Sequence, residues 1–159
     1  MPDAAGVPDA ARVPDAERRR RISLGAVGGC RYGAAMTPIA RLSVIALDCP
    51  DPLALARFYG DLTGWPLDPD EQSENWVQLR PDGGATAIAF QRAPGHRPPD
   101  WPGGEHPQQL HLDFDVPDLD EGERGVLAIG GRKHEFQPGT TFRVYLDPAG
   151  HPFCLVLGA

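Results

Sequence analysis

One stretch of the chain alternates polar and apolar side chains without exception: Gln109-Leu110-His111-Leu112-Asp113-Phe114-Asp115-Val116. Side chains two positions apart point to the same side of a β-strand, so this pattern predicts a strand with one apolar and one polar face. The apolar face is expected to pack on a helix. The polar face has two interpretations from sequence alone: it is the wall of a ligand site, or it is the solvent side of a half-exposed sheet.

The segment has a counterpart 67 residues earlier in the chain. That offset pairs Asp51 with Asp118 and Gly64 with Gly131, and each half shows a strand, a helix and then strands around a Pro-x-Gly turn. Residues 39–91 and 109–157 are therefore predicted to be two copies of one β-α-β-β-β module, joined by a proline-rich linker at 92–108. The same offset places Val44 opposite His111 in the alignment of the halves, so the matching face of the first strand is apolar.

Local chemistry predicts a helix in each half. In the first half, Asp51 can cap the helix, Pro52 suits its first turn and Gly64 ends it. The second helix begins at the capping-box pair Asp118 and Glu121 and ends at residues 130–131. The apolar stripe of the first helix has the spacing i, i+3, i+4 and i+7, with members Leu55, Phe58, Tyr59 and Leu62.

Composition limits the classes of function. Six arginines against four acids give residues 1–36 a net charge of +2, which leaves −9 on residues 37–159, the predicted folded domain. An acidic body disfavours nucleic-acid binding, and no apolar run is long enough for a membrane helix. Three cysteines at unrelated spacings suggest no disulfide framework, so a reducing cytoplasm is expected. Residues 1–36 are predicted to be a disordered extension. The alternative is that the true start is Met36, which residues 1–35 would precede.

The ordered set of motifs resembles the vicinal oxygen chelate superfamily, and more narrowly its glyoxalase-like domain proteins, related to the glyoxalase, bleomycin-resistance and extradiol dioxygenase group. The resemblance covers about residues 38–158. It implies an α+β fold in which two βαβββ modules form an open eight-stranded mixed-sheet cup with the helices outside. The motifs that carry it are residues 51–59, Leu62-Thr63-Gly64-Trp65, His111-Leu112-Asp113-Phe114 and residues 147–156.

The resemblance also implies metal ligands on the first and last strands of each module in metal-dependent members. Those positions fall at Val44, at His111, at Cys154 and at either Ala89 or Gln91. A valine cannot donate and an amide is a weak ligand, so His111 and Cys154 leave two good donors where a divalent ion usually takes three. Asp113 is not expected to complete the set, because side chains i and i+2 on a strand point in parallel. No cofactor is therefore expected; the alternative is a divalent metal held by His111, Gln91 and Cys154.

His111 and Asp113 have three possible roles: polar anchors for a ligand, a structural pair, or a general acid/base pair. Trp101 lies in the linker, where an indole can cover a ligand or form a dimer contact. The candidate ligand-binding residues are Val44, Ala46, Trp76, Gln91, Trp101, Gln109, His111, Asp113 and Cys154.

The predicted function is that of a binding module which holds a small organic molecule, such as a natural product or antibiotic, in a half-apolar cup without a full metal site. The alternative is a lyase, isomerase or dioxygenase that uses His111 with a reduced metal site or by acid–base chemistry. The expected partner is a small molecule, and the resemblance suggests a homodimer.

Overall fold

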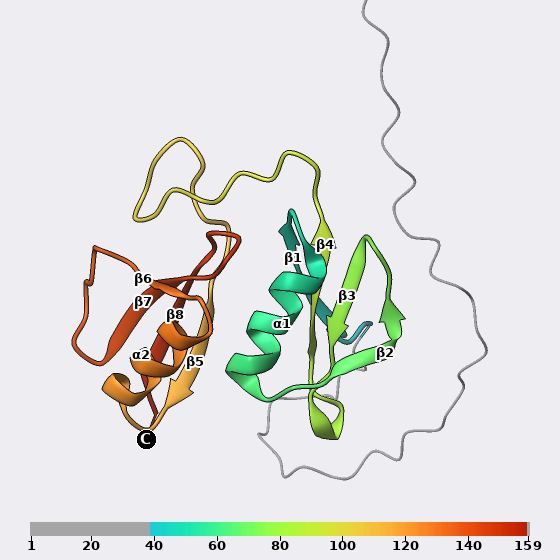
Figure 1. Cartoon of the computed structure of the whole chain (residues 1–159), viewed down its shortest axis with the longest axis horizontal. Coiled ribbons are helices and arrows are strands. Elements are labelled where there is room, and N and C mark those ends of the chain that lie inside the picture. The colour runs from blue at the N-terminus through green and yellow to red at the C-terminus, as the bar shows by residue number, and fades with distance from the viewer. Residues whose placement is uncertain (1–38, 159) are drawn as a thin grey trace, which may run out of the picture. The chain divides into compact units, whose positions relative to one another are not determined.

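The computed structural model describes residues 39–158, and its elements follow the order of two β-α-β-β-β modules (Figure 1). The predicted extension at residues 1–36 lies outside the described residues. Module one contains β1 (Val44–Cys49), α1 (Pro52–Thr63), β2 (Leu67–Gln72), β3 (Trp76–Leu79) and β4 (Ala87–Arg92), with a 3-10 turn at Asp82–Gly84. Module two contains β5 (Leu112–Val116), α2 (Leu119–Ala128), β6 (Arg132–Lys133), β7 (Phe142–Leu146) and β8 (Pro152–Leu157).

Both helices begin as their local chemistry predicts, and α1 also ends as predicted, whereas α2 ends at Ala128 with Ile129 as its C-cap, just before the predicted glycines. The Asp51 carboxylate accepts a hydrogen bond from the Ala54 amide at 3.1 Å, and Gly64 ends α1 in a left-handed conformation with φ 73°. In module two, the Asp118 carboxylate accepts from the Glu121 amide at 2.8 Å. Of residues 39–158, no helix is both long and apolar enough to cross a lipid bilayer.

The strands pair within each module. The orders are β1-β4-β3-β2 and β5-β8-β7-β6, with β1 parallel to β4, β5 parallel to β8 and the other pairs antiparallel. The structure thus confirms an α+β fold of two βαβββ modules with mixed, open sheets, and in the described residues the eight strands form two sheets of four.

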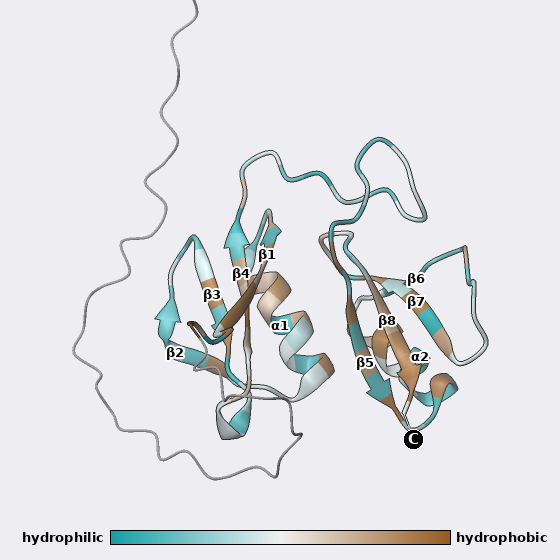
Figure 2. Cartoon of the chain, turned by 180° about the vertical axis from the view of Figure 1, so that it is seen from behind, coloured by the Kyte–Doolittle hydropathy of each residue, from teal (hydrophilic) through white to brown (hydrophobic). Residues whose placement is uncertain are grey.

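Helix α1 packs on the apolar faces of both sheets. The Tyr59 ring stacks on Phe90 of β4 at 5.3 Å and lies 6.0 Å from the ring of Phe114 on β5, while Phe58 contacts Phe153 of β8 at 5.9 Å between ring centroids. Figures 1 and 2 both show α1 between the two sheets, and Figure 2 shows the hydrophobic character of β8. The opposite face of each sheet is consequently turned away from this core.

The strand β5 begins three residues later than the alternation predicts. Residues 109–111 precede it, because the register that pairs Leu112 with Phe153 places Pro152 beside His111. Proline has no N–H to add to the ladder of hydrogen bonds. The backbone of His111 therefore does not have regular strand geometry, and its side chain need not point in parallel with that of Asp113.

Candidate functional site

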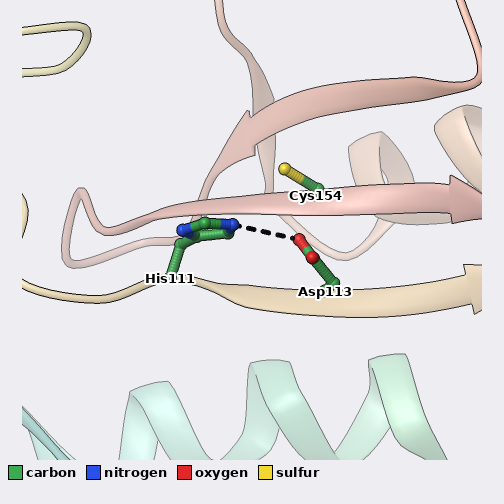
Figure 3. A group of neighbouring side chains, drawn as sticks. All are labelled: His111, Asp113 and Cys154. Carbon is green, nitrogen blue, oxygen red and sulfur yellow. Dashed lines mark ion pairs between the residues drawn. The ribbon is translucent and has the colours of Figure 1, made fainter.

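The second sheet carries a row of residues on the face that points away from α1. The register places Asp113 of β5 beside Cys154 of β8, and Val144 of β7 on the other side of Cys154. Figure 3 shows the side chains of His111, Asp113 and Cys154 together on this side of the strands, opposite α1. The alternating pattern of residues 109–116 thus presents its polar members at an open sheet face.

His111 has a neighbour at each ring nitrogen, a hydrogen bond at Nδ1 and the Asp113 carboxylate at Nε2. Its Nδ1 lies 3.1 Å from the Gln108 side-chain amide nitrogen, which can only donate, and its Nε2 lies 3.4 Å from an Asp113 carboxylate oxygen. Nδ1 is therefore the acceptor and Nε2 carries the proton that faces Asp113. This tautomer follows from the orientation of the Gln108 amide.

One atom each of His111, Asp113 and Cys154 lies within 4.8 Å of the others. The expectation that His111 and Asp113 would point in parallel without converging was wrong. Side chains i and i+2 point in parallel within a regular strand, but His111 precedes β5 and its ring lies along the chain toward Asp113.

Cys154 forms part of the floor of this face, with 9% of its surface exposed. Burial raises the pKa of its thiol to about 12, and a hydrogen bond to the Asp113 carboxylate adds to the rise. The thiol is therefore protonated at neutral pH, which disfavours nucleophilic attack because that reaction uses the thiolate.

An apolar cleft of about 190 Å³ opens beside these residues. Trp101, Phe142 and Val144 line it together with His111 and Cys154. The Trp101 indole is fixed by ring contacts at 5.1 Å to His134 and 5.6 Å to Phe136, so the linker tryptophan has aromatic neighbours that the sequence alone did not reveal.

Gln108 also lines the apolar cleft, and sequence reasoning missed it. Its side-chain oxygen is buried and, among the described residues, has no hydrogen-bond partner, because the amide nitrogen is directed at His111. A buried acceptor without a partner costs about 1–3 kcal/mol, so a donor supplied by a ligand would relieve that cost. No sequence signal distinguishes Gln108 from Gln109 beside it.

A second cleft, of about 320 Å³, brings together Ala46, Gln109 and His111 of the predicted site residues. It is also lined by Tyr59 and by three further histidines of the linker and the turn before β8: His96, His106 and His151. The predicted site residues Val44, Trp76 and Gln91 lie on the first sheet and line neither cleft.

The strand register decides which residue of module one corresponds to Cys154. Asp113 pairs with Cys154, and Ala46, its counterpart 67 positions earlier, pairs with Ala89. Ala89 rather than Gln91 therefore occupies the fourth position at which the resemblance places a metal ligand. The residues present at those four positions, Val44, Ala89, His111 and Cys154, do not fit a divalent ion, because Val44 and Ala89 have no donor atom and only two donors remain.

Asp147 is a fully buried carboxylate behind the second cleft. One oxygen accepts from the backbone amides of Ala149 and His151, each at 2.9 Å, and the other accepts from the Tyr59 hydroxyl at 3.0 Å and from His151 Nδ1 at 2.8 Å. Burial and the charge of Asp147 raise the pKa of Tyr59 well above its usual range. This network joins α1 to the turn between β7 and β8.

A family model described as a glyoxalase-like domain matches residues 44–156, which is most of the chain. The chain therefore belongs to the glyoxalase-like domain family. None of the curated proteins compared with the sequence matches it.

Several solved structures are similar in fold. A glyoxalase/bleomycin resistance protein/dioxygenase family enzyme from Burkholderia phytofirmans PsJN has a TM-score of 0.58 and 21% identity, over 73% of this chain and 97% of that chain. TnmS3, an antibiotic binding protein from Streptomyces sp. CB03234, has a TM-score of 0.51 and 19% identity, over 78% of this chain and 100% of that one. At such identities the likeness establishes the fold alone.

Proposed function

We propose that the protein binds a small organic ligand at the apolar cleft beside His111, and that the ligand combines a planar apolar body with an N–H donor, such as a protonated amine. The observation that carries the proposal is the pairing of an aromatic-lined cleft with the buried, unpartnered acceptor Gln108 Oε1. Ligand sites are typically mostly apolar, with a few polar groups that fix orientation.

The apolar part of the ligand would pack between Trp101 and Phe142 above Val144. Because His134 and Phe136 already hold the Trp101 ring, little side-chain freedom is lost when a ligand covers it. The volume of about 190 Å³ suits a one- or two-ring group rather than a whole drug-sized molecule.

The polar part of the site offers acceptors. Gln108 Oε1 lacks a donor, and the Asp113 carboxylate is half exposed beside His111. Asp115 follows on the same face and is exposed. A cationic amine would gain attraction from both carboxylates, whereas an anionic group would be repelled.

The similarity to TnmS3 supports binding as a function of this fold, since that protein is named for binding an antibiotic. The donor set at Val44, Ala89, His111 and Cys154 supports a role that does not depend on a metal at those positions. The proposed ligand of this chain is accordingly a natural product or similar metabolite with an aromatic ring and an amine.

Two probes with the same ring and opposite charge test the proposal. Calorimetric titration should show that 1-naphthylmethylamine, a cation at pH 7, binds the chelator-treated protein at one site, while 1-naphthylacetate binds at least tenfold more weakly. Trp101→Ala should weaken binding of the amine at least tenfold, which corresponds to about 1.4 kcal/mol.

The matched control is Leu127→Ala, which truncates an exposed apolar side chain on α2 outside the cleft and should leave binding unchanged. Equal affinity for the two probes would refute the charge preference. An unchanged affinity for the amine in Trp101→Ala would refute the location of the site.

A second candidate function is supported by the proximity of His111, Asp113 and Cys154 within 4.8 Å. In that case His111 would act in a lyase, isomerase or dioxygenase, either in general acid/base catalysis together with Asp113 or as a ligand of a divalent ion. A stoichiometric divalent ion in the purified protein that is lost in His111→Ala would favour this enzyme over the binding module.

A further inference from the structure

The second cleft holds two adjacent histidines that the proposed function does not use. His96 comes from the linker and His151 from the turn between β7 and β8, and their ring centroids are 5.0 Å apart. Both line the cleft of about 320 Å³.

His151 has a defined tautomer. Its Nδ1 lies 2.8 Å from an oxygen of the buried Asp147, whose two oxygens accept three other hydrogen bonds and act as the acceptor here too. Nδ1 therefore carries the proton, and in the neutral ring Nε2 keeps its lone pair. Among the described residues, no hydrogen bond is recorded for that Nε2 atom.

His96 is fixed in the same way by a different acceptor. Its Nε2 lies 3.1 Å from the backbone carbonyl oxygen of Ala149, which can only accept. Nε2 is therefore protonated, and Nδ1 keeps its lone pair in the neutral ring. Two neighbouring histidines thus each donate one ring N–H to a carboxylate or a carbonyl and leave the other nitrogen available.

Histidines that ligate metals almost always show this arrangement, because the outer hydrogen bond fixes both the tautomer and the ring orientation. The geometry points to a divalent transition-metal site formed by His96 Nδ1 and His151 Nε2, and we propose such a site here. Imidazole ligands favour Zn²⁺, Ni²⁺ or Cu²⁺ over Mg²⁺ and Ca²⁺.

The distance between the two rings agrees with this assignment. A Zn–N bond of about 2.1 Å places the centre of an imidazole ring roughly 3.2 Å from the metal, so two ligands at a tetrahedral angle have ring centres roughly 5.2 Å apart. The observed separation is 5.0 Å.

The site is open rather than closed. In the described part of the chain, the one group of three metal-ligating side chains is the sheet-face cluster of His111, Asp113 and Cys154, so this histidine pair supplies two protein ligands. The remaining coordination positions would be filled by water or an exogenous ligand. Asp147 behind His151 and Asp48 on the cleft wall supply negative charge, while the nearby Arg97 guanidinium is bonded to His106 Nε2 at 3.3 Å.

The test is a titration of the full, chelator-treated and reduced chain with Zn²⁺, followed by calorimetry and by the NMR resonances of the histidine ring nitrogens. The expected result is one equivalent of Zn²⁺ that shifts the resonances of His96 and His151. His96→Gln and His151→Gln should each weaken binding at least about tenfold. His134→Gln, a histidine outside the cleft, is the matched control and should leave the affinity unchanged.

His96→Gln does not touch the buried carboxylate, so it tests the site even if His151→Gln disturbs the fold. Absence of Zn²⁺ binding to the wild-type chain would overturn the proposal. It would equally be overturned if binding survived both substitutions but was lost in His111→Ala, since the ion would then lie at the sheet face. Neither outcome affects naphthylmethylamine binding, so the two proposals fail independently.

Discussion

Tyr59→Phe isolates the hydrogen bond that joins helix α1 to the second module. The Tyr59 hydroxyl donates at 3.0 Å to Asp147, and both residues are buried. The substitution removes one donor from a buried carboxylate and leaves the ring in place against Phe90 and Phe153. Its effect therefore reports on the polar link rather than on the aromatic packing.

The expected loss of unfolding free energy depends on the hydrogen bonds that Asp147 retains in the variant. A hydrogen bond to a charged group contributes about 1.5–3 kcal/mol, and three donors to the carboxylate remain, namely two backbone amides and His151 Nδ1. The lower part of that range is expected, so Tyr59→Phe should reduce the free energy of unfolding by about 1.5–2 kcal/mol. For a domain of this size, that loss lowers Tm by roughly 5–10 °C.

Urea unfolding followed by tryptophan fluorescence measures the change. Tyr145→Phe is the matched control: its hydroxyl donates at 3.1 Å to Glu123, which also pairs with Lys133 and Arg143 nearer the surface. That variant should lose only about 0.5–1 kcal/mol. A loss in Tyr59→Phe no greater than in the control would refute the claim that the buried link stabilises the contact between the modules.

Tyr59 should also make the free energy of unfolding depend on pH. Burial, with the charge of Asp147, raises the pKa of Tyr59 in the folded state above its unfolded value of about 10. The stability that this shift contributes is complete below that value and is lost as pH rises above it. The difference in unfolding free energy between wild type and Tyr59→Phe should therefore narrow above about pH 10; a constant difference would contradict the assignment.

Two further predictions concern packing and the sheet face. Gly122→Ala should destabilise the protein by about 1 kcal/mol or more in the urea assay, because the new Cβ would lie 2.8 Å from the buried Leu155 side chain. Gly125→Ala, on the same helix but with open space around the new Cβ, should stabilise the protein by up to about 1 kcal/mol. Equal effects of the two substitutions would contradict the packing of α2. Asp113→Asn should lower the pKa of the Cys154 thiol from about 12 and so speed its alkylation by iodoacetamide at pH 8. Mass spectrometry of the peptide that contains Cys154 measures the rate. An unchanged rate would show that the carboxylate does not raise the pKa of the thiol.

Much of the fold could be predicted because its signals are local. The caps at Asp51 and Asp118, the glycine at 64 and the alternation around His111 each depend on a few neighbouring residues. The 67-residue sequence repeat then predicts that those elements form two modules. Pairing within a module follows from that order, since a strand, a helix and a parallel strand form one compact unit.

The parts that could not be predicted depend on distant contacts. Tyr59 and Asp147 are 88 residues apart, and nothing in the apolar stripe of the helix shows that its tyrosine hydroxyl meets a carboxylate of the other module. The correspondence of Ala89 with Cys154 required the strand register, because hairpin lengths differ between the halves. The convergence of His111 with Asp113 required knowing where β5 begins.

The most direct test of the proposed ligand site is methyl and indole NMR during titration with 1-naphthylmethylamine in the presence of EDTA. Val144 lines the apolar cleft, whereas Val77 is equally buried on the helix-facing side of the first sheet. A ligand in the apolar cleft should shift the resonances of the Val144 methyl groups and the Trp101 indole, with saturation at one equivalent, and should leave the Val77 resonances unchanged. Shifts confined to Val77 or to other residues of the first sheet would contradict it.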